Sequence, residues 1–358
     1  MRVLVTGSQG YIGSILTTRL IEAGCDVEGL DVGWFNDCMF QQPPNGYVLR
    51  RQDMRDVAVD ELIGFDAIVH LAALSNDPLG NLDPDLTMRL NHEGTLRLAK
   101  LAKQAEVRRF IVSSSCSIYG KAGDALIDEN AQLNPVTAYG KSKALIDRDV
   151  SHLADAWFTP VFLRHATAYG VSPRLRLDLV LNDLVASAFL SGKILMLSDG
   201  TPWRPLVHVE DISRAFIAAL KAPQEAVHNE AFNIGSTSEN YQISELADFI
   251  RQAIPDATIE YAPNAGPDLR CYRVDFSKAE RCLPGFNPQW TVARGVEQLL
   301  SAYRTRPLTA NDASGPSFRR LARLQQLGAQ GLIDEELRWT EPATEEAFQY
   351  SPSGEMTK

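Results

Sequence analysis

The feature that most constrains this chain is a glycine-rich turn near its N-terminus, Gly7-Ser8-Gln9-Gly10-Tyr11-Ile12-Gly13. It follows a short apolar run at 3–5, which predicts a buried strand, and leads into residues 15–21, whose apolar side chains recur at helical spacing. In such a unit the first glycine permits a tight turn, the second lets a pyrophosphate approach the backbone, and the third lets the helix pack closely on the strand. The stretch therefore predicts a dinucleotide site, with phosphates at the helix N-terminus.

A carboxylate after the second predicted strand indicates which dinucleotide binds. Residues 27–30 form another apolar run, and Asp31 follows it, eighteen residues after Gly13. An acid here accepts hydrogen bonds from both hydroxyls of the adenosine ribose and repels a 2′-phosphate, which favours NAD over NADP. The alternative is a surface aspartate that caps a loop.

Strands and helices alternate through the first half of the chain. Further strands are expected at 47–49, 67–73, 109–114 and 160–164, and helices at 57–63, 86–106 and 139–153. This alternation predicts an α/β fold with a Rossmann-type, doubly wound parallel sheet. Ligands bind at the carboxyl ends of such strands. The polar residues just past the predicted strand ends are Asp31, Asp53, Ser75 and Ser115.

The second half is less regular and predicts a smaller, discontinuous substrate domain. Helices are expected at 179–190, 211–220 and 244–253, the last with Ser244 as N-cap. The predicted NAD-binding domain holds residues 1–164 and about 205–232, and the substrate-binding domain about 165–204 and 233–304. Residues 305–358 form a C-terminal extension with one helical stretch at 318–327, and we expect its last fifteen or so residues to be disordered.

Composition excludes several classes of partner. A net charge of −10 without a long basic run argues against nucleic acid or an anionic membrane surface. No apolar run approaches the ~20 residues of a membrane span, and no signal peptide precedes the first strand. The five cysteines and six histidines are scattered without metal-ligand spacing, so we expect no metal, reduced thiols and a cytoplasmic location.

Tyr139 and Lys143 lie one turn apart at the start of a predicted helix, so they share a face. A free tyrosine titrates near ~10, and a neighbouring cation favours the phenolate. If Lys143 and an oxidised nicotinamide lower this pKa to ~7, Tyr139 is a general base near neutral pH. Ser115 follows the preceding strand and offers a hydroxyl to the same substrate oxygen. The alternatives are an ordinary amphipathic helix start and a polar turn.

Taken together, these motifs resemble the extended short-chain dehydrogenase/reductases, in particular the NAD-dependent nucleotide-sugar epimerase/dehydratase family. The resemblance covers roughly residues 1–303. Its marks are Gly7-x-x-Gly10-x-x-Gly13, Asp31, Asp53-Met54, His70-Leu71-Ala72-Ala73, Asn91, Ser115, Tyr139-x-x-x-Lys143, Arg164, Asp199-Gly200-Thr201, Arg204, His208-Val209-Glu210-Asp211 and Asn233-Ile234-Gly235.

The resemblance implies a role for each matching residue. The expected catalytic residues are Ser115 and Tyr139 for proton transfer and Lys143 on the nicotinamide ribose. The residues expected to bind NAD are Gly7, Gly10, Tyr11, Ile12, Gly13, Asp31, Asp53, Met54, Leu71, Ala72, Ala73, Ser75, Asn91, Ser113, Tyr139 and Lys143. The residues expected to bind a nucleotide-diphosphate sugar are Ser75, Ser115, Cys116, Ser117, Thr167, Asn182, Arg204 and Arg270.

Departures from the family pattern narrow the reaction. Sugar 4,6-dehydratases carry an Asp-Glu pair directly after the catalytic hydroxyl residue, and related decarboxylases carry a Glu there, whereas this chain has Cys116-Ser117. Without that acid the usual proton donor for C6–O cleavage is missing. Thr167 stands where many relatives have Asn, and Ala265 where a phosphate-binding Arg is frequent, a role that Arg270 would then take.

The sequence thus predicts an NAD-dependent nucleotide-sugar epimerase that acts at C4 through a transient 4-keto sugar. The alternative is a nucleotide-4-keto-sugar reductase of deoxysugar biosynthesis, and a dehydratase comes third. A non-catalytic NAD sensor is disfavoured, because sensors commonly lose the Tyr/Lys pair that this chain keeps. The resemblance also suggests a homodimer through the helices at 86–106 and 139–153.

Overall fold

The computed structural model describes residues 1–42, 46–266, 268 and 270–341. At the centre of these residues is a seven-stranded sheet in the order β11-β7-β5-β4-β1-β2-β3, in which every pairing is parallel. Its strands are β1 (Arg2–Thr6), β2 (Asp26–Asp31), β3 (Val48–Arg51), β4 (Ala67–His70), β5 (Arg109–Ser115), β7 (Thr159–His165) and β11 (Glu230–Ile234). The predicted α/β fold with a Rossmann-type sheet is confirmed.

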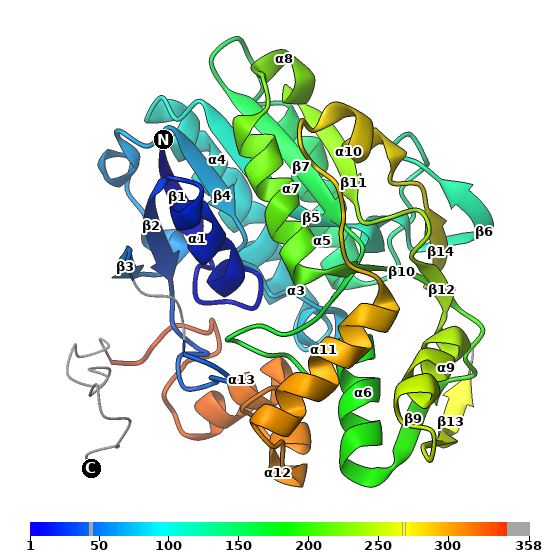
Figure 1. Cartoon of the computed structure of the whole chain (residues 1–358). Helices are drawn as coiled ribbons and strands as arrows, with labels where there is room; N and C mark the ends of the chain where they lie inside the picture. Colours follow the sequence, from blue (N-terminus) through cyan, green and yellow to red (C-terminus); the bar gives the residue numbers. More distant parts are fainter. Residues whose placement is uncertain (43–45, 267, 269, 342–358) are drawn as a thin grey trace.

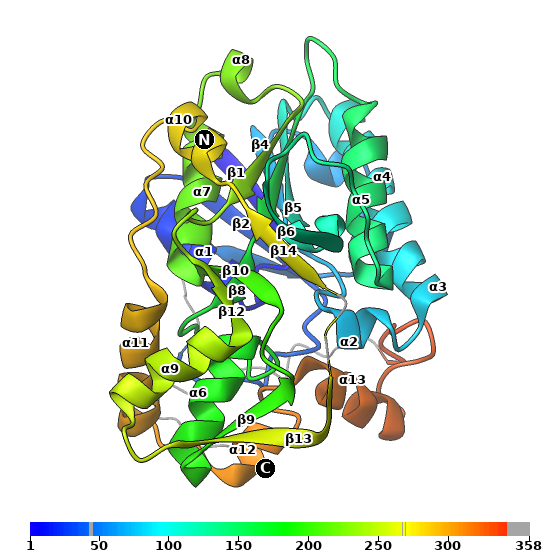
Figure 2. The same ribbon diagram turned by 90° about the vertical axis from the view of Figure 1, so that its right-hand side faces the viewer.

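Helices cover both faces of this sheet (Figures 1 and 2). On one face, α1 (Gly13–Glu22) and α7 (Val209–Lys221) pack with Val3 and Val5. On the other, α4 (Gly94–Gln104) and α5 (Ala138–Ser151) pack in the cluster that holds Leu4. Side chains alternate across a strand. A continuous apolar run such as 3–5 is therefore buried on both faces, as parallel sheets require.

A second lobe with its own apolar core lies below the sheet in Figures 1 and 2. Its strands are β8 (Thr167–Tyr169), β10 (Trp203–His208), β12 (Asn240–Gln242), β9 (Lys193–Ser198) and β13 (Thr258–Gly266). Its main helices are α6 (Val180–Ser191), α9 (Ile243–Ala253) and α11 (Val292–Thr305). A separate pair, β6 (Lys121–Ile127) and β14 (Cys271–Val274), joins segments far apart in the chain. The predicted domain boundaries stay predictions.

Short helical elements connect these parts. They are α2 (Asp77–Gly80), α3 (Pro84–Thr87), the π-helical segment η3 (Met88–Glu93), the 3₁₀ segment η4 (Cys116–Tyr119), α8 (Gln224–Val227), α10 (Ser277–Cys282), α12 (Ala310–Ser314) and α13 (Arg320–Ala329). The predicted helix at 86–106 is therefore a run of α3, η3 and α4 rather than one regular helix.

Two local predictions are wrong. Residues 57–63 do not form an α-helix but lie around two 3₁₀ turns, η1 (Met54–Asp56) and η2 (Asp60–Leu62). The Asp53 carboxylate closes the first turn by accepting from the Arg55 N–H at 2.9 Å, and the backbone then extends at residue 57. Helix α9 is capped by Gln242 rather than Ser244. The Glu245 carboxylate accepts from the Gln242 N–H at 2.6 Å, which completes a capping box.

The C-terminal extension folds back onto the first half of the chain. After α12 and α13, residues 331–339 pack on the loop that follows β2 and on α3. The expected disorder of the last fifteen or so residues concerns a segment outside the described range. No helix in the described part of the chain is long and apolar enough to span a membrane.

Candidate active site

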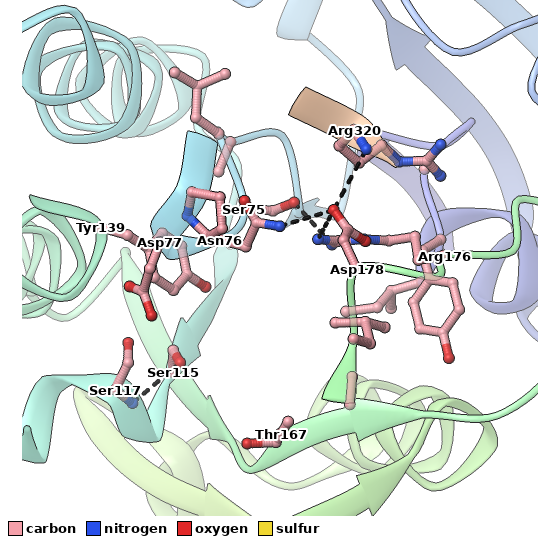
Figure 3. Close-up of a pocket in the computed structure, with 18 of the residues that line it drawn as sticks. Ser75, Asn76, Asp77, Ser115, Ser117, Tyr139, Thr167, Arg176, Asp178 and Arg320 are labelled. Atoms are coloured by element: carbon pink, nitrogen blue, oxygen red, sulfur yellow. Dashed lines mark hydrogen bonds and ion pairs between the residues drawn. The ribbon is translucent and has the colours of Figure 1, made fainter. Parts of the chain in front are cut away.

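A cavity of about 860 Å³ lies at the carboxyl ends of the central strands, between the sheet and the second lobe. Its walls come from the glycine turn after β1, the ends of β2 and β5, the loop after β4, the first turn of α5, and the second lobe. Figure 3 shows part of this cavity, with Ser115 and Tyr139 on one side and Arg176 and Arg320 on the other. The strand-end rule thus places the predicted polar residues in one space.

The glycine turn is a cradle of backbone without room for side chains. Gly7 has a φ of 72°, and a Cβ there would lie 2.8 Å from the amide nitrogen of Ala72. A Cβ on Gly13 would lie 2.8 Å from the carbonyl carbon of Ser8. Such distances require a backbone shift, so only glycine fits. The bare backbone and the N-terminus of α1 suit a bound pyrophosphate, and the predicted dinucleotide therefore fits this turn.

The adenosine side of the cavity is lined as predicted by Asp31, Asp53 and Met54. Asp31 accepts from the N–H groups of Gln9 at 2.9 Å and Gly33 at 2.8 Å, while its burial raises the pKa of the carboxyl. Asp53 is ion-paired with Arg55 at 2.5 Å. Other predicted cofactor residues that line the cavity are Gly7, Gly10, Tyr11, Ile12, Gly13, Leu71, Ala72, Ala73, Ser75 and Ser113.

Ser115, Tyr139 and Lys143 converge on one wall of the same cavity. The Lys143 ammonium donates to the Ser113 carbonyl at 2.6 Å and lies 5.8 Å from the centroid of the Tyr139 ring. The Ser115 hydroxyl accepts from the Ser117 N–H at 3.2 Å and acts on Tyr139 by lowering the pKa of its phenol. Thr137 caps α5 by accepting from the Gly140 N–H at 3.1 Å, which fixes the first turn, on which Tyr139 lies. A phenol, an amine and an alcohol thus meet as the sequence predicts.

The protein's own groups do not make Tyr139 a base. Burial raises the pKa of Tyr139 to about 12, and the neighbouring Ser115 hydroxyl offsets only part of this rise. Burial also lowers the pKa of Lys143 to about 8. The predicted lowering of the tyrosine pKa therefore depends on the second charge named in that prediction, the oxidised nicotinamide.

Three predicted ligand-binding residues lie behind the cavity wall rather than in it. Asn91, in η3, is fully buried, and its amide bonds both the N–H and the carbonyl of Leu74 at 2.8 and 3.1 Å. Asn182 accepts from the Gly170 N–H at 3.0 Å and donates to a carbonyl of the loop before α6. The Cys116 thiol is fully buried and donates to the Arg164 carbonyl at 3.2 Å. These side chains hold the backbone that lines the cavity.

The substrate side of the cavity contains a network of ion pairs. Arg204 contacts Asp268 at 2.8 Å, and Arg270 contacts the same carboxylate at 2.5 Å. Arg270 also pairs with Asp77, whose other oxygen accepts from the Thr137 hydroxyl at 2.6 Å. Thr167 and Ser117 line this side as predicted. Asp77 was not predicted, because only the fold brings it to Arg270.

A second charged cluster lies opposite Tyr139 (Figure 3). Arg176 forms a bidentate pair with Asp178, at 2.8 and 3.1 Å, and donates to the Ser75 hydroxyl at 3.0 Å. Asp178 also accepts from the Asn76 amide at 2.8 Å. Arg176 and Asp178 are only two positions apart in the sequence, and this spacing could have indicated the ion pair. Arg320 joins the same wall from the C-terminal extension, and nothing in the sequence pointed to it.

No group of three or more histidine, cysteine, aspartate and glutamate side chains in the described residues is arranged to hold a metal ion. The chemistry available at this site is therefore that of a phenol, an ammonium group and hydroxyls beside a dinucleotide cradle, with guanidinium groups at the far side. This arrangement suits proton transfer to or from a hydroxyl whose carbon exchanges a hydride.

Comparison with known proteins gives a consistent result. Residues 3–235 match the family described as "NAD dependent epimerase/dehydratase family". A UDP-glucose 4-epimerase of Mycolicibacterium smegmatis is 29% identical, with 86% of this chain and 99% of that protein covered. UDP-glucuronic acid decarboxylase 1 of Arabidopsis thaliana is 28% identical over 88% of this chain and 72% of its own.

Among solved structures, MoeE5 in complex with UDP-glucuronic acid and NAD is 29% identical, with a TM-score of 0.74. The comparison covers 86% of this chain and 100% of that chain. About a seventh of this chain therefore has no counterpart in a relative that is matched over its full length.

Proposed function

We propose that this chain, which belongs to the NAD-dependent epimerase/dehydratase family, is a nucleotide-sugar epimerase that acts at C4. As a member of that family it is an enzyme, and its cofactor is NAD. The observation that carries the proposal is the meeting of Ser115, Tyr139 and Lys143 in the cavity that also holds the glycine cradle. The names of relatives, which include UDP-glucose 4-epimerases, support this reaction class.

The side chains divide the work as follows. Tyr139 accepts the proton of the C4 hydroxyl, and Ser115 holds the same oxygen by a hydrogen bond. NAD supplies reversible hydride transfer at C4, with no net redox change. Lys143 stays protonated and favours the phenolate of Tyr139. After the 4-keto sugar has turned in the cavity, Tyr139 returns the proton to the oxygen of the inverted centre.

The far side of the cavity would hold the nucleotide diphosphate. Arg204 and Arg270 line this side, and a guanidinium binds phosphate oxygens in a bidentate way. In the structure both arginines share Asp268, so a bound diphosphate would compete with a carboxylate for them. The nucleotide base and the sugar are left to experiment.

The surroundings of Ser115 disfavour a dehydratase. Cys116 is buried away from the cavity, and Ser117 offers a hydroxyl where a dehydratase carries an acid. Asp77 lines the cavity and acts electrostatically on Tyr139, but both of its oxygens already accept hydrogen bonds, from Thr137 and Arg270. This carboxylate is therefore committed to holding the site together rather than to protonating a leaving group at C6.

The test is incubation of the purified protein with UDP-, dTDP- and GDP-sugars, followed by chromatography of the products. We expect a C4 epimer from at least one donor without added NADH. No epimer from any donor, together with NADH consumption by a nucleotide-4-keto-sugar, would instead identify a 4-ketoreductase. Loss of water from the sugar would identify a dehydratase.

We also propose a homodimer through α4 and α5. Leu96 and Leu101 on α4 and Leu153 just after α5 remain only partly buried in the single chain. Helices that leave apolar side chains in this state commonly bury them in a four-helix contact. Light scattering of the eluting protein should give twice the mass of the chain, and a monomeric mass at micromolar concentration would contradict the proposal.

A further inference from the structure

Arg320 is a buried cation that forms no ion pair with the side chains that the structure describes. It lines the main cavity, and only 3% of its surface is exposed. Its Nη2 donates to the carbonyl of Arg174 at 3.0 Å, whereas its Nη1 is buried and has no hydrogen-bond partner among the described residues. A buried guanidinium is costly unless an anion or hydrogen-bond acceptors surround it.

The charges that face Arg320 do not balance it. Asp178 accepts from its backbone N–H at 3.4 Å, but that carboxylate already forms a bidentate pair with Arg176. Arg174 and Arg176 add like charge, and together with burial they lower the pKa of Arg320 to about 10. Asp31 also faces Arg174 and Arg320, so three guanidinium groups meet two carboxylates here. Since a guanidinium with this pKa is still charged at neutral pH, the cluster holds an excess of positive charge against the cavity.

The position of Arg320 indicates which anion would meet this charge. Its guanidinium carbon lies 4.3 Å from the centroid of the Phe35 ring, in the loop that follows Asp31. It acts electrostatically on Asp31 and on Tyr11 of the glycine turn. The side chain therefore lies on the cofactor side of the cavity, near the N-terminus of α1. It is not part of the ion-pair network of Arg204 and Arg270.

Arg320 is held there by a segment that we call the C-terminal clasp, residues 316–339. The Trp34 indole donates to the Leu337 carbonyl at 3.1 Å, and the Trp339 indole donates to the Val32 carbonyl at 2.7 Å. An apolar cluster joins the clasp to the loops after β2 and β4. Its members are Trp34, Phe35, Leu74, Leu79, Leu86, Leu90, Leu321, Leu324, Leu327, Ile333, Leu337 and Trp339.

We propose that Arg320 is a cofactor-binding residue, which uses Nη1 to bind the anionic pyrophosphate of NAD from the side opposite the glycine turn. The clasp then connects the two loops that flank the dinucleotide, so NAD is released only when the clasp loosens. This inference needs a bound dinucleotide and nothing of the sugar chemistry. It holds whether the enzyme epimerises or reduces its substrate. Arg320 lies outside the segment that matches the family description.

The test compares full-length wild type with Arg320→Met, Arg320→Lys and the control Arg251→Met. Arg251 lies on α9, outside the clasp, its side chain is half exposed, and it does not line the cavity. The readouts are the NAD bound per chain after gel filtration and the rate at which labelled NAD is released after dilution into unlabelled NAD. Neither measurement involves a sugar.

Arg320→Met should release NAD roughly 10- to 100-fold faster than wild type, which is the range for one lost charge-assisted hydrogen bond. Arg320→Lys should fall between the two, and Arg251→Met should lie within about threefold of wild type. Equal release rates for wild type and a folded Arg320→Met would overturn the proposal. If Arg320→Met does not fold, Arg320→Lys decides alone, with a rate at least threefold above wild type as support and the wild-type rate as refutation.

Discussion

The two sides of the cavity differ in the chemical groups that line them. The cofactor side is built around a glycine turn and a helix N-terminus, where the backbone itself lines the cavity. The substrate side consists of long charged side chains paired with one another, such as Arg204 with Asp268 and Arg270 with Asp77. A backbone cradle is rigid and tolerates no added atom, whereas an ion-pair network can exchange partners.

This difference predicts different consequences of mutation. A change on the cofactor side should act on folding and NAD retention, because the backbone itself is displaced. A change on the substrate side should act on KM, because a charged side chain of the ion-pair network can be lost without moving the sheet. Between these two sides lies the wall that carries Ser115, Tyr139 and Lys143, which we call the catalytic wall. A change there should affect kcat alone.

The largest effect is expected for Tyr139→Phe, which removes the proton acceptor and leaves the ring in place. We expect kcat to fall by about 10³-fold, within the range for general acid–base catalysis, while bound NAD stays at the wild-type level. Tyr261→Phe is the control, since that side chain is 55% exposed on β13. A variant that retained more than a tenth of the wild-type kcat would show that the catalytic wall has been wrongly assigned.

Gly13→Ala probes the cofactor side and should be the next most severe change. The new Cβ would overlap the backbone of Gly7 and Ser8, so we expect a loss of about 2–3 kcal/mol in the free energy of unfolding, together with loss of NAD. The control is Gly24→Ala, which meets no atom within 4 Å but has a φ of 81°. It should cost about 1 kcal/mol and leave NAD bound. If the two variants lost NAD equally, the glycine turn would not be the rigid cradle that distinguishes the cofactor side.

The same difference explains how much the sequence revealed. The cofactor side was predictable because its constraints are local: three glycines in one turn, an acid at the next strand end, and a tyrosine and lysine one helical turn apart. The parallel sheet followed from apolar runs at regular intervals. Capping could not be predicted equally well, because whether Gln242 or Ser244 begins the helix is a difference of only two positions.

The substrate side and the clasp were not predictable for the opposite reason. Arg270 and Asp77 are 193 residues apart, and Arg320 reaches Arg174 across 146 residues. No pattern within either segment specifies these contacts. Asn91, Asn182 and Cys116 were expected at the ligand, but the fold turns them toward neighbouring backbone. Motif residues can therefore support a cavity wall without reaching its surface.

Arg204→Met tests whether the substrate side is energetically separate. We expect KM for the sugar nucleotide to rise roughly 10- to 100-fold, as for the loss of a charge-assisted contact to phosphate, with kcat and NAD content within about twofold of wild type. Arg251→Met is the control, because its side chain is half exposed on α9. Loss of NAD from Arg204→Met would show that the two sides of the cavity are coupled.

The smallest expected effect is a dependence of kcat/KM on pH, which arises from Lys143 on the catalytic wall. Burial lowers the pKa of Lys143 to about 8, so its ammonium loses its proton as the pH rises through this value. We expect kcat/KM to fall severalfold between about pH 8 and pH 9, and this fall to be absent in Lys143→Arg, whose guanidinium does not titrate there.

The contribution of Lys143 to the free energy of unfolding changes with pH in the opposite direction. Between about pH 8 and the ordinary lysine pKa near ~10.4, the unfolded chain binds the proton that the folded chain has lost, so this contribution increases with pH. Thermal unfolding followed over the same range separates the two. A fall in kcat/KM that tracks a fall in melting temperature, or that persists unchanged in Lys143→Arg, would show that Lys143 is not the titrating group.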